Sequence, residues 1–382
     1  MELARYKQHA FGRARRTIGP HGYVAFFPSP LPRRVELSAE TAAVMAEAES
    51  ALGRLDGVSQ LLPNPNLLVR PYVLREAVAS TRIEGTRATI EDVYNADASD
   101  TTVTADVEEV VNYVRATEHA VERLTVLPLS MRLVREAHEL LLDGVRGRDK
   151  QPGQLRTTQN WIGSPTSTIE TATYVPPPPE AMRAALDDWE VFVNDDSAAT
   201  PLLAKCALMH YQFEAIHPFL DGNGRVGRLL IVLFLIDRGR ISRPVLYVSP
   251  YFEKNRDTYI GHLQSIHEHG QPDAWIGFFC EAIVDQARDA VRRARALVEL
   301  REDYRRRVPM QSNIQALVDA LFDSPVLTSR VVEQRLGVTR PTSLRLLQQL
   351  ADRGIINPRT PGPRAQHRWQ ADAVMHVLTD EG

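Results

Sequence analysis

The stretch His217-Pro-Phe-Leu-Asp-Gly-Asn-Gly-Arg-Val-Gly-Arg228 carries most of the chemistry that this sequence displays. An apolar run, Leu229 to Ile236, follows it directly. Before it, apolar residues recur at steps of three and four, which predicts a helix: Leu202, Cys206, Met209, Phe213 and Ile216. A polar, glycine-bearing loop between two buried helices is expected to bind a charged group.

The second half of this stretch has the features of an anion site. Asn223 and Gly224 stand where the second helix is expected to begin, and the free N–H groups of a helix start attract anions. Glycine also lets a ligand approach the backbone closely. Arg225 and Arg228 are three residues apart on one helical face, so both guanidinium groups can reach the same anion.

The first half adds groups that can do chemistry. Asp221 offers the hard oxygen that suits Mg²⁺, a metal that usually arrives with phosphates. His217 titrates near neutral pH and is the natural base. An anion site, a metal ligand and a base together predict phosphoryl or nucleotidyl transfer. The alternative, a capped helix start with surface arginines and a packed histidine, explains each residue singly but not the whole set.

The stretch resembles the signature of the Fic family, His-x-Phe-x-(Asp/Glu)-Gly-Asn-Gly-Arg-x-x-Arg, at every defining position. Fic proteins typically transfer AMP from ATP to a hydroxyl of a target protein. The resemblance implies that His217 deprotonates a Ser, Thr or Tyr hydroxyl, that Asp221 holds Mg²⁺ and that Phe219 anchors the loop. For the phosphates of ATP it implies contacts from Gly222, Asn223, Gly224, Arg225 and, at the γ-phosphate, Arg228.

Length and composition set wider limits. At 382 residues the chain is expected to hold two or three domains. A formal net charge of −3 gives no general argument for nucleic-acid or membrane binding. Two cysteines in apolar helical patterns, a start without an apolar secretion signal and the absence of a long apolar run predict a cytoplasmic protein without membrane contact.

Residues 1–100 are expected to form an N-terminal arm and helices. Gly-Pro and Pro-Ser-Pro steps predict a non-helical arm over 1–36. A helix is expected to begin after Ser38, a good N-cap, and to end at Asp56-Gly57. A further helix over about 67–84 stops at Gly85.

Ser80 and Glu84 share one face of that second helix. By themselves they belong to an ordinary amphipathic helix with a solvated carboxylate. Many Fic proteins, however, carry an inhibitory helix with the motif (Ser/Thr)-x-x-x-Glu-(Gly/Asn), which Ser80-Thr-Arg-Ile-Glu84-Gly85 matches. The resemblance implies that Glu84 pairs with Arg228 and keeps the γ-phosphate from its productive position.

Residues 101–307 are expected to form the Fic core. A Ser-Pro turn between β-formers predicts a short β-hairpin at 160–178, either a surface excursion or the family's flap, which aligns a target chain by strand addition. In Fic relatives a helix like the one beginning near Ser249 borders the nucleoside. We therefore expect Asn255 to contact ribose or adenine and Tyr251 or Tyr259 to stack on the base, although a plain surface helix is the alternative.

Residues 310–382 differ in kind from the rest. Two short helices around Gly337, a terminal Gly354 and a β-return resemble a winged helix-turn-helix. Seven arginines and one acid between Arg335 and Arg368 give a local charge of +6, which is a footprint for DNA. Many winged helices instead bind proteins, so residues 335–368 are a candidate surface for either partner.

The expected fold is mainly α: a Fic-type helical bundle with a short β-hairpin flap and a C-terminal winged helix-turn-helix. The leading functional hypothesis is an autoinhibited, ATP- and Mg²⁺-dependent protein adenylyltransferase. The alternatives are a DNA-binding regulator with a nucleotide-sensing Fic domain, a de-AMPylase, or a transferase of another nucleotide. Dimerisation is common in the family, which favours a homodimer, and the target protein is left open.

Overall fold

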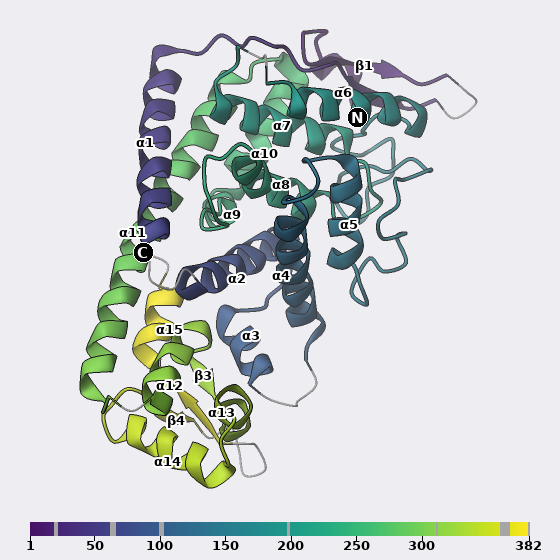
Figure 1. Cartoon of the computed structure of the whole chain (residues 1–382). Helices are drawn as coiled ribbons and strands as arrows, with labels where there is room; N and C mark the ends of the chain where they lie inside the picture. The colour runs from purple at the N-terminus through teal and green to yellow at the C-terminus, as the bar shows by residue number, and fades with distance from the viewer. Residues whose placement is uncertain are drawn as a thin grey trace.

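The computed structural model describes residues 1–18, 22–61, 66–98, 103–196, 199–310, 312–359 and 367–380. The fold is mainly helical, as predicted, with small sheets near the two ends (Figure 1). The elements are, in chain order, η1 (Leu3–Arg5), β1 (Gly12–Arg16), β2 (Val24–Pro28), α1 (Ala39–Leu61), α2 (Asn66–Ile83), α3 (Ile90–Asp97), α4 (Ala105–Arg123), α5 (Met131–Leu141), α6 (Pro179–Asn194), α7 (Leu202–Ile216), α8 (Asn223–Asp237), α9 (Ser249–Lys254), α10 (Arg256–His269), α11 (Asp273–Arg307), α12 (Ser312–Asp323), β3 (Val326–Leu327), α13 (Ser329–Leu336), α14 (Arg340–Ala351), β4 (Asn357–Arg359), β5 (Arg368–Gln370) and α15 (Asp372–Thr379).

Helices α7 and α8 form the centre of the larger part of the molecule. Both are apolar over most of their circumference, and almost every residue of each is buried. A helix that is apolar on all sides must be surrounded by other elements, and here α6, α11, α2, α4 and α5 pack around the pair. The predicted helix–loop–helix is confirmed, with the 217–228 loop at its turn.

Helix α2 lies between the α8 side of the bundle and α9, and it also packs on α4 (Figure 1). The predicted stop near Gly85 is confirmed, since α2 ends at Ile83 and Gly85 has a φ of +99°. Two faces of α2 are therefore buried against different neighbours. This placement matters for the site described below.

Helix α1 runs alongside the long α11 (Figure 1). The Ser38 hydroxyl accepts a hydrogen bond from the N–H of Thr41 at 3.1 Å, so the predicted N-cap is confirmed. The predicted end at Asp56-Gly57 is wrong, because the helix continues to Leu61. A glycine inside a helix costs only about 1 kcal/mol, and the burial of Leu52 and Leu55 outweighs that cost.

The N-terminal arm is not simply extended. Strands β1 and β2 form a two-stranded antiparallel sheet in which Ala14 faces Phe26. Phe26 is fully buried and packs in tilted contacts with the rings of Tyr174 and His267, which docks the arm on the body. The sequence analysis did not predict this pairing, because β1 is rich in arginine and lacks the β-branched and aromatic residues that are enriched in strands.

The C-terminal residues form a compact unit of α12, β3, α13, α14, β4, β5 and α15. Its sheet has the order β3-β5-β4, with Val326 and Asn357 both paired to Gln370. The predicted turn at 358–363 lies mostly outside the described residues. This unit packs against the larger part of the molecule, since α12 contacts α2 and α11, and α15 contacts α11 and α3.

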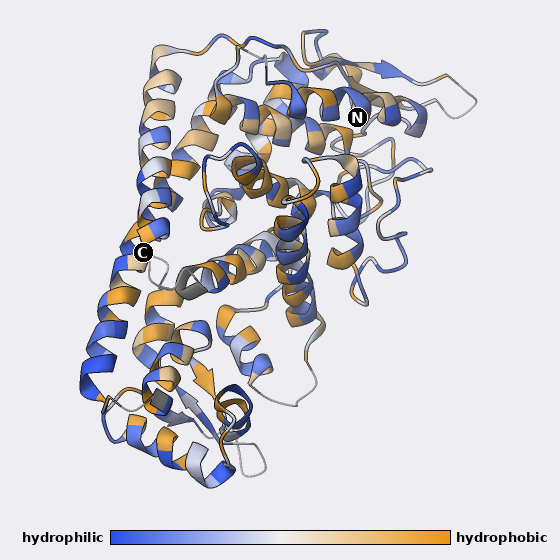
Figure 2. Cartoon of the chain, viewed as in Figure 1, coloured by the Kyte–Doolittle hydropathy of each residue, from blue (hydrophilic) through white to orange (hydrophobic). Residues whose placement is uncertain are grey.

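Hydropathy follows this arrangement. Apolar residues concentrate in the central helices, whereas the second half of α11 is rich in hydrophilic residues (Figure 2). Within the described parts of the chain, every helix is too short or too polar to cross a membrane.

Candidate functional site

The 217–228 loop is held in a strained, well-anchored shape. His217 has a φ of +50°; in the described ranges only it and Gln151 among non-glycine residues have a positive φ. Such backbone strain persists only where neighbours enforce it and often marks a functional site. The Asn223 side chain spans the loop, accepting from the N–H of Phe219 and donating to its C=O, both at 2.8 Å.

These two hydrogen bonds limit how Asn223 can contact an anion. Its side-chain amide is committed to Phe219, so its own contribution to an anion site is the N–H at the start of α8. Gly222, the N-cap, has a φ of +79°, a conformation that favours glycine. The helix start predicted at Asn223 is confirmed, and its first N–H groups are available for an anion.

His217 is in the state that a general base requires. Its Nδ1 lies 3.3 Å from the C=O of Glu214, which can only accept, so Nδ1 carries the proton and Nε2 keeps its lone pair. Burial, followed by the charge of Arg156, lowers the pKa of His217 from 6.5 to about 4. The imidazole is therefore neutral at physiological pH, with 17% of its side chain exposed.

Arg225 is buried with part of its donor capacity unused. Its Nη1 binds Glu109 Oε2 at 2.9 Å, and Nη2 lies 3.5 Å from Asp221 Oδ1. Within the described part of the chain, Nε and Nη2 make no hydrogen bond. A buried guanidinium with unmet donors is costly unless a ligand completes it, and a phosphate would do so.

Asp221 suits a magnesium ion. Its carboxylate is partly exposed, and Oδ1 accepts from the N–H of Gly222 at 2.6 Å. Gly147 is needed beside it, because a Cβ there would lie 2.8 Å from Oδ2. No group of three His, Cys, Asp or Glu in the described ranges could hold a metal. A single carboxylate fits Mg²⁺ that takes its other ligands from phosphates and water.

Arg228 is held by Ser80 of α2 and by Glu84, which directly follows the end of that helix. Its Nη2 donates to Glu84 Oε1 at 2.7 Å and to the C=O of Ser80 at 2.8 Å, while Nε donates to Ser80 Oγ at 2.9 Å. Glu84 also lies against the loop: a Cβ on Gly224 would come within 2.4 Å of its Oε1. The carboxylate thus sits against the anion loop, beside the arginine that is expected to receive a phosphate.

The charges of this pair reinforce each other. Burial would raise the pKa of Glu84, but the charge and hydrogen bond of Arg228 outweigh it and lower the pKa. Glu84, in turn, raises the pKa of the buried Arg228 despite the opposing effect of desolvation. Both groups are therefore ionised over the whole physiological range.

Residues outside the motif fix the loop. His138 stacks on Phe219 with ring centroids 3.7 Å apart, and its Nε2 donates to the C=O of Asp221 at 2.9 Å. Phe219 is fully buried, so its expected anchoring role agrees with its position. Arg156, also fully buried, donates to the C=O groups of His217 and Ile216 at the end of α7.

Glu214 is a site residue that the sequence prediction missed. It precedes His217 by one helical turn, and its Oε2 lies 4.0 Å from His217 Nδ1. Its Oε1 is buried without a hydrogen bond among the described residues. Burial raises its pKa to about 7, although Arg228 opposes this. The sequence signal that could have identified Glu214 is its i,i+3 spacing to His217. Glu109 of α4, which binds Arg225, has no such signal in the sequence.

The expected nucleoside contacts are only partly placed. Asn255 lies at the break between α9 and α10, where its Nδ2 donates to the C=O of Tyr251, and its contact with a nucleoside stays a prediction. Of the two tyrosines expected as alternatives for stacking on the base, Tyr259 is excluded by its burial, and Tyr251 stays a prediction. Tyr259 is buried, stacked on Phe252, and its hydroxyl lies 2.8 Å from His210 Nε2.

The expected hairpin at 160–178 is reduced to one β-bridge, between Ile162 and Tyr174. Asn160 ties its start to the motif by donating to the C=O of Phe219 at 2.8 Å. Tyr174 ties its end to α7 through the C=O of Ala215. The segment lies beside the loop but has too few mutual hydrogen bonds to form a ladder, so its use as a flap stays a prediction.

Comparison with known proteins identifies two regions. Residues 42–122 match the family model described as Fic/DOC family N-terminal, and residues 128–235 match that of the Fic/DOC family. Protein adenylyltransferase fic-1 of Caenorhabditis briggsae is 31% identical over 144 residues, which are 35% of this chain and 27% of that protein. A probable protein adenylyltransferase of Aquifex aeolicus is 32% identical over 97 residues, 25% of this chain and 28% of that protein. The chain thus spans about a quarter of the length of these curated relatives.

Solved structures support the fold. A Fic family protein from Desulfovibrio desulfuricans matches with a TM-score of 0.59 and 23% identity, over 89% of this chain and 98% of that one. A Fic domain containing signaling protein from Bacteroides thetaiotaomicron gives 0.52 and 19%, over 67% of this chain and 97% of that one. At these identities the likeness concerns the fold and not the activity.

Proposed function

We propose that this chain, which carries Fic/DOC regions, is a protein adenylyltransferase that transfers AMP from ATP to a Ser, Thr or Tyr hydroxyl of a target protein. The observation that supports this most directly is the 217–228 loop itself. It combines a neutral histidine, a partly exposed carboxylate, a helix N-terminus and a buried arginine with unmet donors. The relatives named as protein adenylyltransferases agree with it.

Each group has a role in the proposed reaction. His217 Nε2 takes the proton of the target hydroxyl, whose oxygen forms a bond to the α-phosphorus while the bond to the β-phosphate oxygen breaks. Pyrophosphate leaves. The α8 N-terminus and Arg225 bind the α- and β-phosphates and stabilise the charge that develops. Asp221 would hold Mg²⁺, which neutralises phosphate charge when bound.

We further propose that the native chain is autoinhibited by Glu84. Glu84 occupies Arg228 and lies against Gly224, so it competes with the γ-phosphate for one guanidinium. ATP can then bind only in a pose that is out of line for attack on the α-phosphorus. The shared chemistry of carboxylate and phosphate makes the two mutually exclusive at Arg228.

The test is self-labelling and lysate labelling with ATP carrying a label on the α-phosphate, in the presence of Mg²⁺. Glu84→Gly is expected to label at least about tenfold faster than the native chain, since loss of a charged hydrogen-bonded partner is worth about 1.5–3 kcal/mol. His217→Ala in the Glu84→Gly background is expected to abolish labelling. If Glu84→Gly labels nothing, the transferase proposal fails; labelling that survives His217→Ala removes the assigned base.

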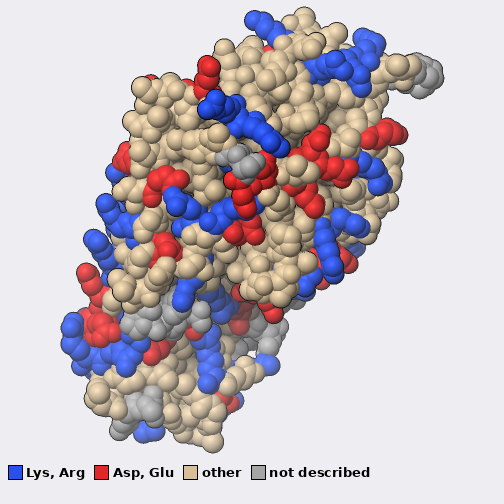
Figure 3. Space-filling model, turned by 45° about the horizontal axis from the view of Figure 1, so that its top comes forward, with Lys and Arg blue, Asp and Glu red and all other residues tan. Residues whose placement is uncertain are grey.

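The DNA-binding hypothesis has less support from the surface. Arg335 and Arg359 pair with acids of the same chain, Arg353 binds C=O groups, and Arg368 binds Asn95. In the view of Figure 3 acidic and basic side chains are interspersed over the visible surface. Regulation through DNA stays a prediction, for which salt-dependent binding of DNA by the full chain is the measurement.

A further inference from the structure

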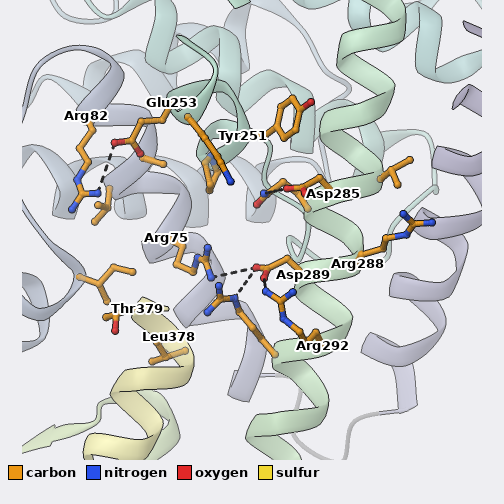
Figure 4. A pocket seen from close by; sticks show the side chains of 18 of the residues that line it. Arg75, Arg82, Tyr251, Glu253, Asp285, Arg288, Asp289, Arg292, Leu378 and Thr379 are labelled. Carbon is orange, nitrogen blue, oxygen red and sulfur yellow. Dashed lines mark hydrogen bonds and ion pairs between the residues drawn. The ribbon is translucent and has the colours of Figure 1, made fainter. Parts of the chain in front are cut away.

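A cavity of about 1120 Å³ lies on the side of α2 that faces away from the motif. It is bounded by α1, α2, α9, α11 and the end of α15, and no residue of the 217–228 loop lines it. Arg75 of α2 points into it toward α11 (Figure 4). Arg75 and Ser80, which contacts Arg228, are five positions apart in α2, which at about 100° per residue separates them by about 140° around the helix.

One corner of this cavity has an excess of positive charge. Arg75, Arg292 and Arg293 all lie against the single carboxylate of Asp289 (Figure 4). Arg293 also donates to the C=O groups of Val377 and Asp380 at the end of α15. Elsewhere in the lining, Glu47 pairs with Arg288 and Glu253 pairs with Arg82, one base to one acid. Three guanidinium groups with one carboxylate leave about two positive charges uncompensated there.

Of these three arginines, Arg75 has a buried guanidinium nitrogen without a hydrogen-bond partner among the described residues. Its side chain is 14% exposed, and its buried Nη1 makes no hydrogen bond among the described residues, although it lies 3.3 Å from Asp289 Oδ2. Burying a guanidinium donor without a partner is costly. Desolvation and the neighbouring charge of Arg293 lower the pKa of Arg75, which agrees with an environment short of negative charge.

We propose that this cavity binds a small metabolite that carries a phosphate or carboxylate group, with the anion between Arg75 and Arg292. The cavity is much larger than an inorganic ion, and its α2 wall beyond Arg75 includes the apolar Val78 and Ala79. An anionic head at the arginine corner and an apolar body along that wall match the usual make-up of a ligand pocket.

The ligand would also act on α2. An anion bridging Arg75 on α2 and Arg292 on α11 fastens α2 in the position in which Glu84 pairs with Arg228. We call this bridging of α2 and α11 by the bound anion the clamp. Its effect on activity rests on the proposed function: the ligand would act as an inhibitor that strengthens autoinhibition. Binding itself does not depend on the proposed function, so the two parts are tested separately.

Binding is tested on the full chain by calorimetry with two probes, phenyl phosphate and isophthalate, which distinguish a phosphate from a carboxylate ligand. Arg292→Gln, an exposed position that does not threaten folding, is expected to weaken binding of the preferred probe by about tenfold, and Arg75→Gln at least as much. Arg306→Gln, exposed near the end of α11, is the matched control and is expected to bind like the native chain. Equal binding by native chain, Arg75→Gln and Arg292→Gln, or no binding of either probe, overturns the site.

The clamp is tested by amide hydrogen exchange, which needs no activity. The bound probe is expected to slow exchange in α2 of the native chain but not of Arg292→Gln. It is also expected to slow self-labelling of the native chain and to leave Glu84→Gly unaffected. Unchanged exchange in α2 refutes the clamp, and equal inhibition of Glu84→Gly shows competition at the motif instead. Absence of labelling in every variant refutes the proposed function and leaves the binding result standing.

Discussion

His217 shows how one side chain is prepared for its proposed role by its surroundings. A left-handed backbone conformation ends α7 and turns the imidazole out of the helix. The C=O of Glu214 fixes the proton on Nδ1, and burial lowers the pKa to about 4. A base that is already neutral needs no deprotonation before it accepts the proton of the target hydroxyl.

The first prediction concerns this pKa. For Glu84→Gly, kcat/KM for ATP with Mg²⁺ in excess is expected to stay nearly constant from pH 8 down to about 5.5. The reason is that a base with a pKa of about 4 remains unprotonated over that range. A base with an ordinary pKa near 6.5 would lose about tenfold by pH 5.5. An acid limb centred at 6.5, with folding verified at each pH, contradicts the assigned environment.

Glu214 gives the second prediction, for stability. Burial raises its pKa from 4.5 to about 7. Between these values the folded protein keeps a proton that the unfolded chain has lost, so this group's contribution to stability falls as pH rises. Glu214→Gln removes this titration. Between pH 5 and pH 8, the free energy of unfolding of the variant is therefore expected to rise by about 2–3 kcal/mol relative to that of the native chain.

The measurement is urea unfolding of both proteins at the two pH values. The exposed Glu299→Gln on α11 is the control and is expected to show no such divergence. A constant difference between Glu214→Gln and the native chain across the pH range would show that Glu214 titrates normally in the folded state.

At the scale of elements, α2 is the part of the fold that connects the site to the rest of the molecule. One face carries Ser80 to Arg228, Glu84 reaches the same arginine from just beyond the end of the helix, and another face carries Arg75 into the cavity. Buried Glu76 fastens the same helix by accepting hydrogen bonds from Tyr113 and from the start of α9. A shift of α2 would therefore move Ser80 and Glu84 relative to Arg228.

The third prediction follows from the two bonds that Ser80 makes to Arg228. Ser80→Ala removes the Oγ acceptor of Nε and leaves the backbone bond, which weakens the inhibited state by about 1 kcal/mol. Basal self-labelling is expected to rise about fivefold, less than in Glu84→Gly. Ser59→Ala, a buried serine of α1 away from the loop, is the control. A rate unchanged from the native chain would mean that the Ser80 hydroxyl does not contribute to the inhibited state.

At the scale of the whole molecule, the C-terminal unit and the central helical bundle share contacts through α2, α3 and α11. Arg293 of α11 binds the last C=O groups of α15, and Arg368 binds Asn95 of α3. The C-terminal unit thus lies beside α2, the helix proposed to take part in autoinhibition, and the end of α15 lines the proposed ligand cavity.

The last prediction concerns ligand binding by the complete chain. MgATP is expected to raise the Tm of both the native chain and Glu84→Gly, because it binds only the folded state. The increase is expected to be about 2–4 °C larger for Glu84→Gly, in which no carboxylate competes for Arg228. Equal shifts would show that Glu84 and the γ-phosphate do not compete.

The sequence by itself determined the parts of the site that are local. The apolar periodicity of α7 and α8 predicts a helix–loop–helix. His217, Asp221 and Arg225 lie within one short stretch of the sequence, so they are close together whatever the rest of the chain does. The resemblance to the Fic family added the pairing of Glu84 with Arg228, and the structure has this ion pair.

Only the tertiary structure decided the rest. Glu109, His138 and Arg156 meet the loop from separate elements, and which buried side chains meet depends on how whole helices pack rather than on spacing along the chain. The same reason explains why Tyr259 is a core residue and why the expected hairpin keeps a single bridge: a strand-like sequence forms a ladder only when its neighbours leave its backbone groups free to pair with each other.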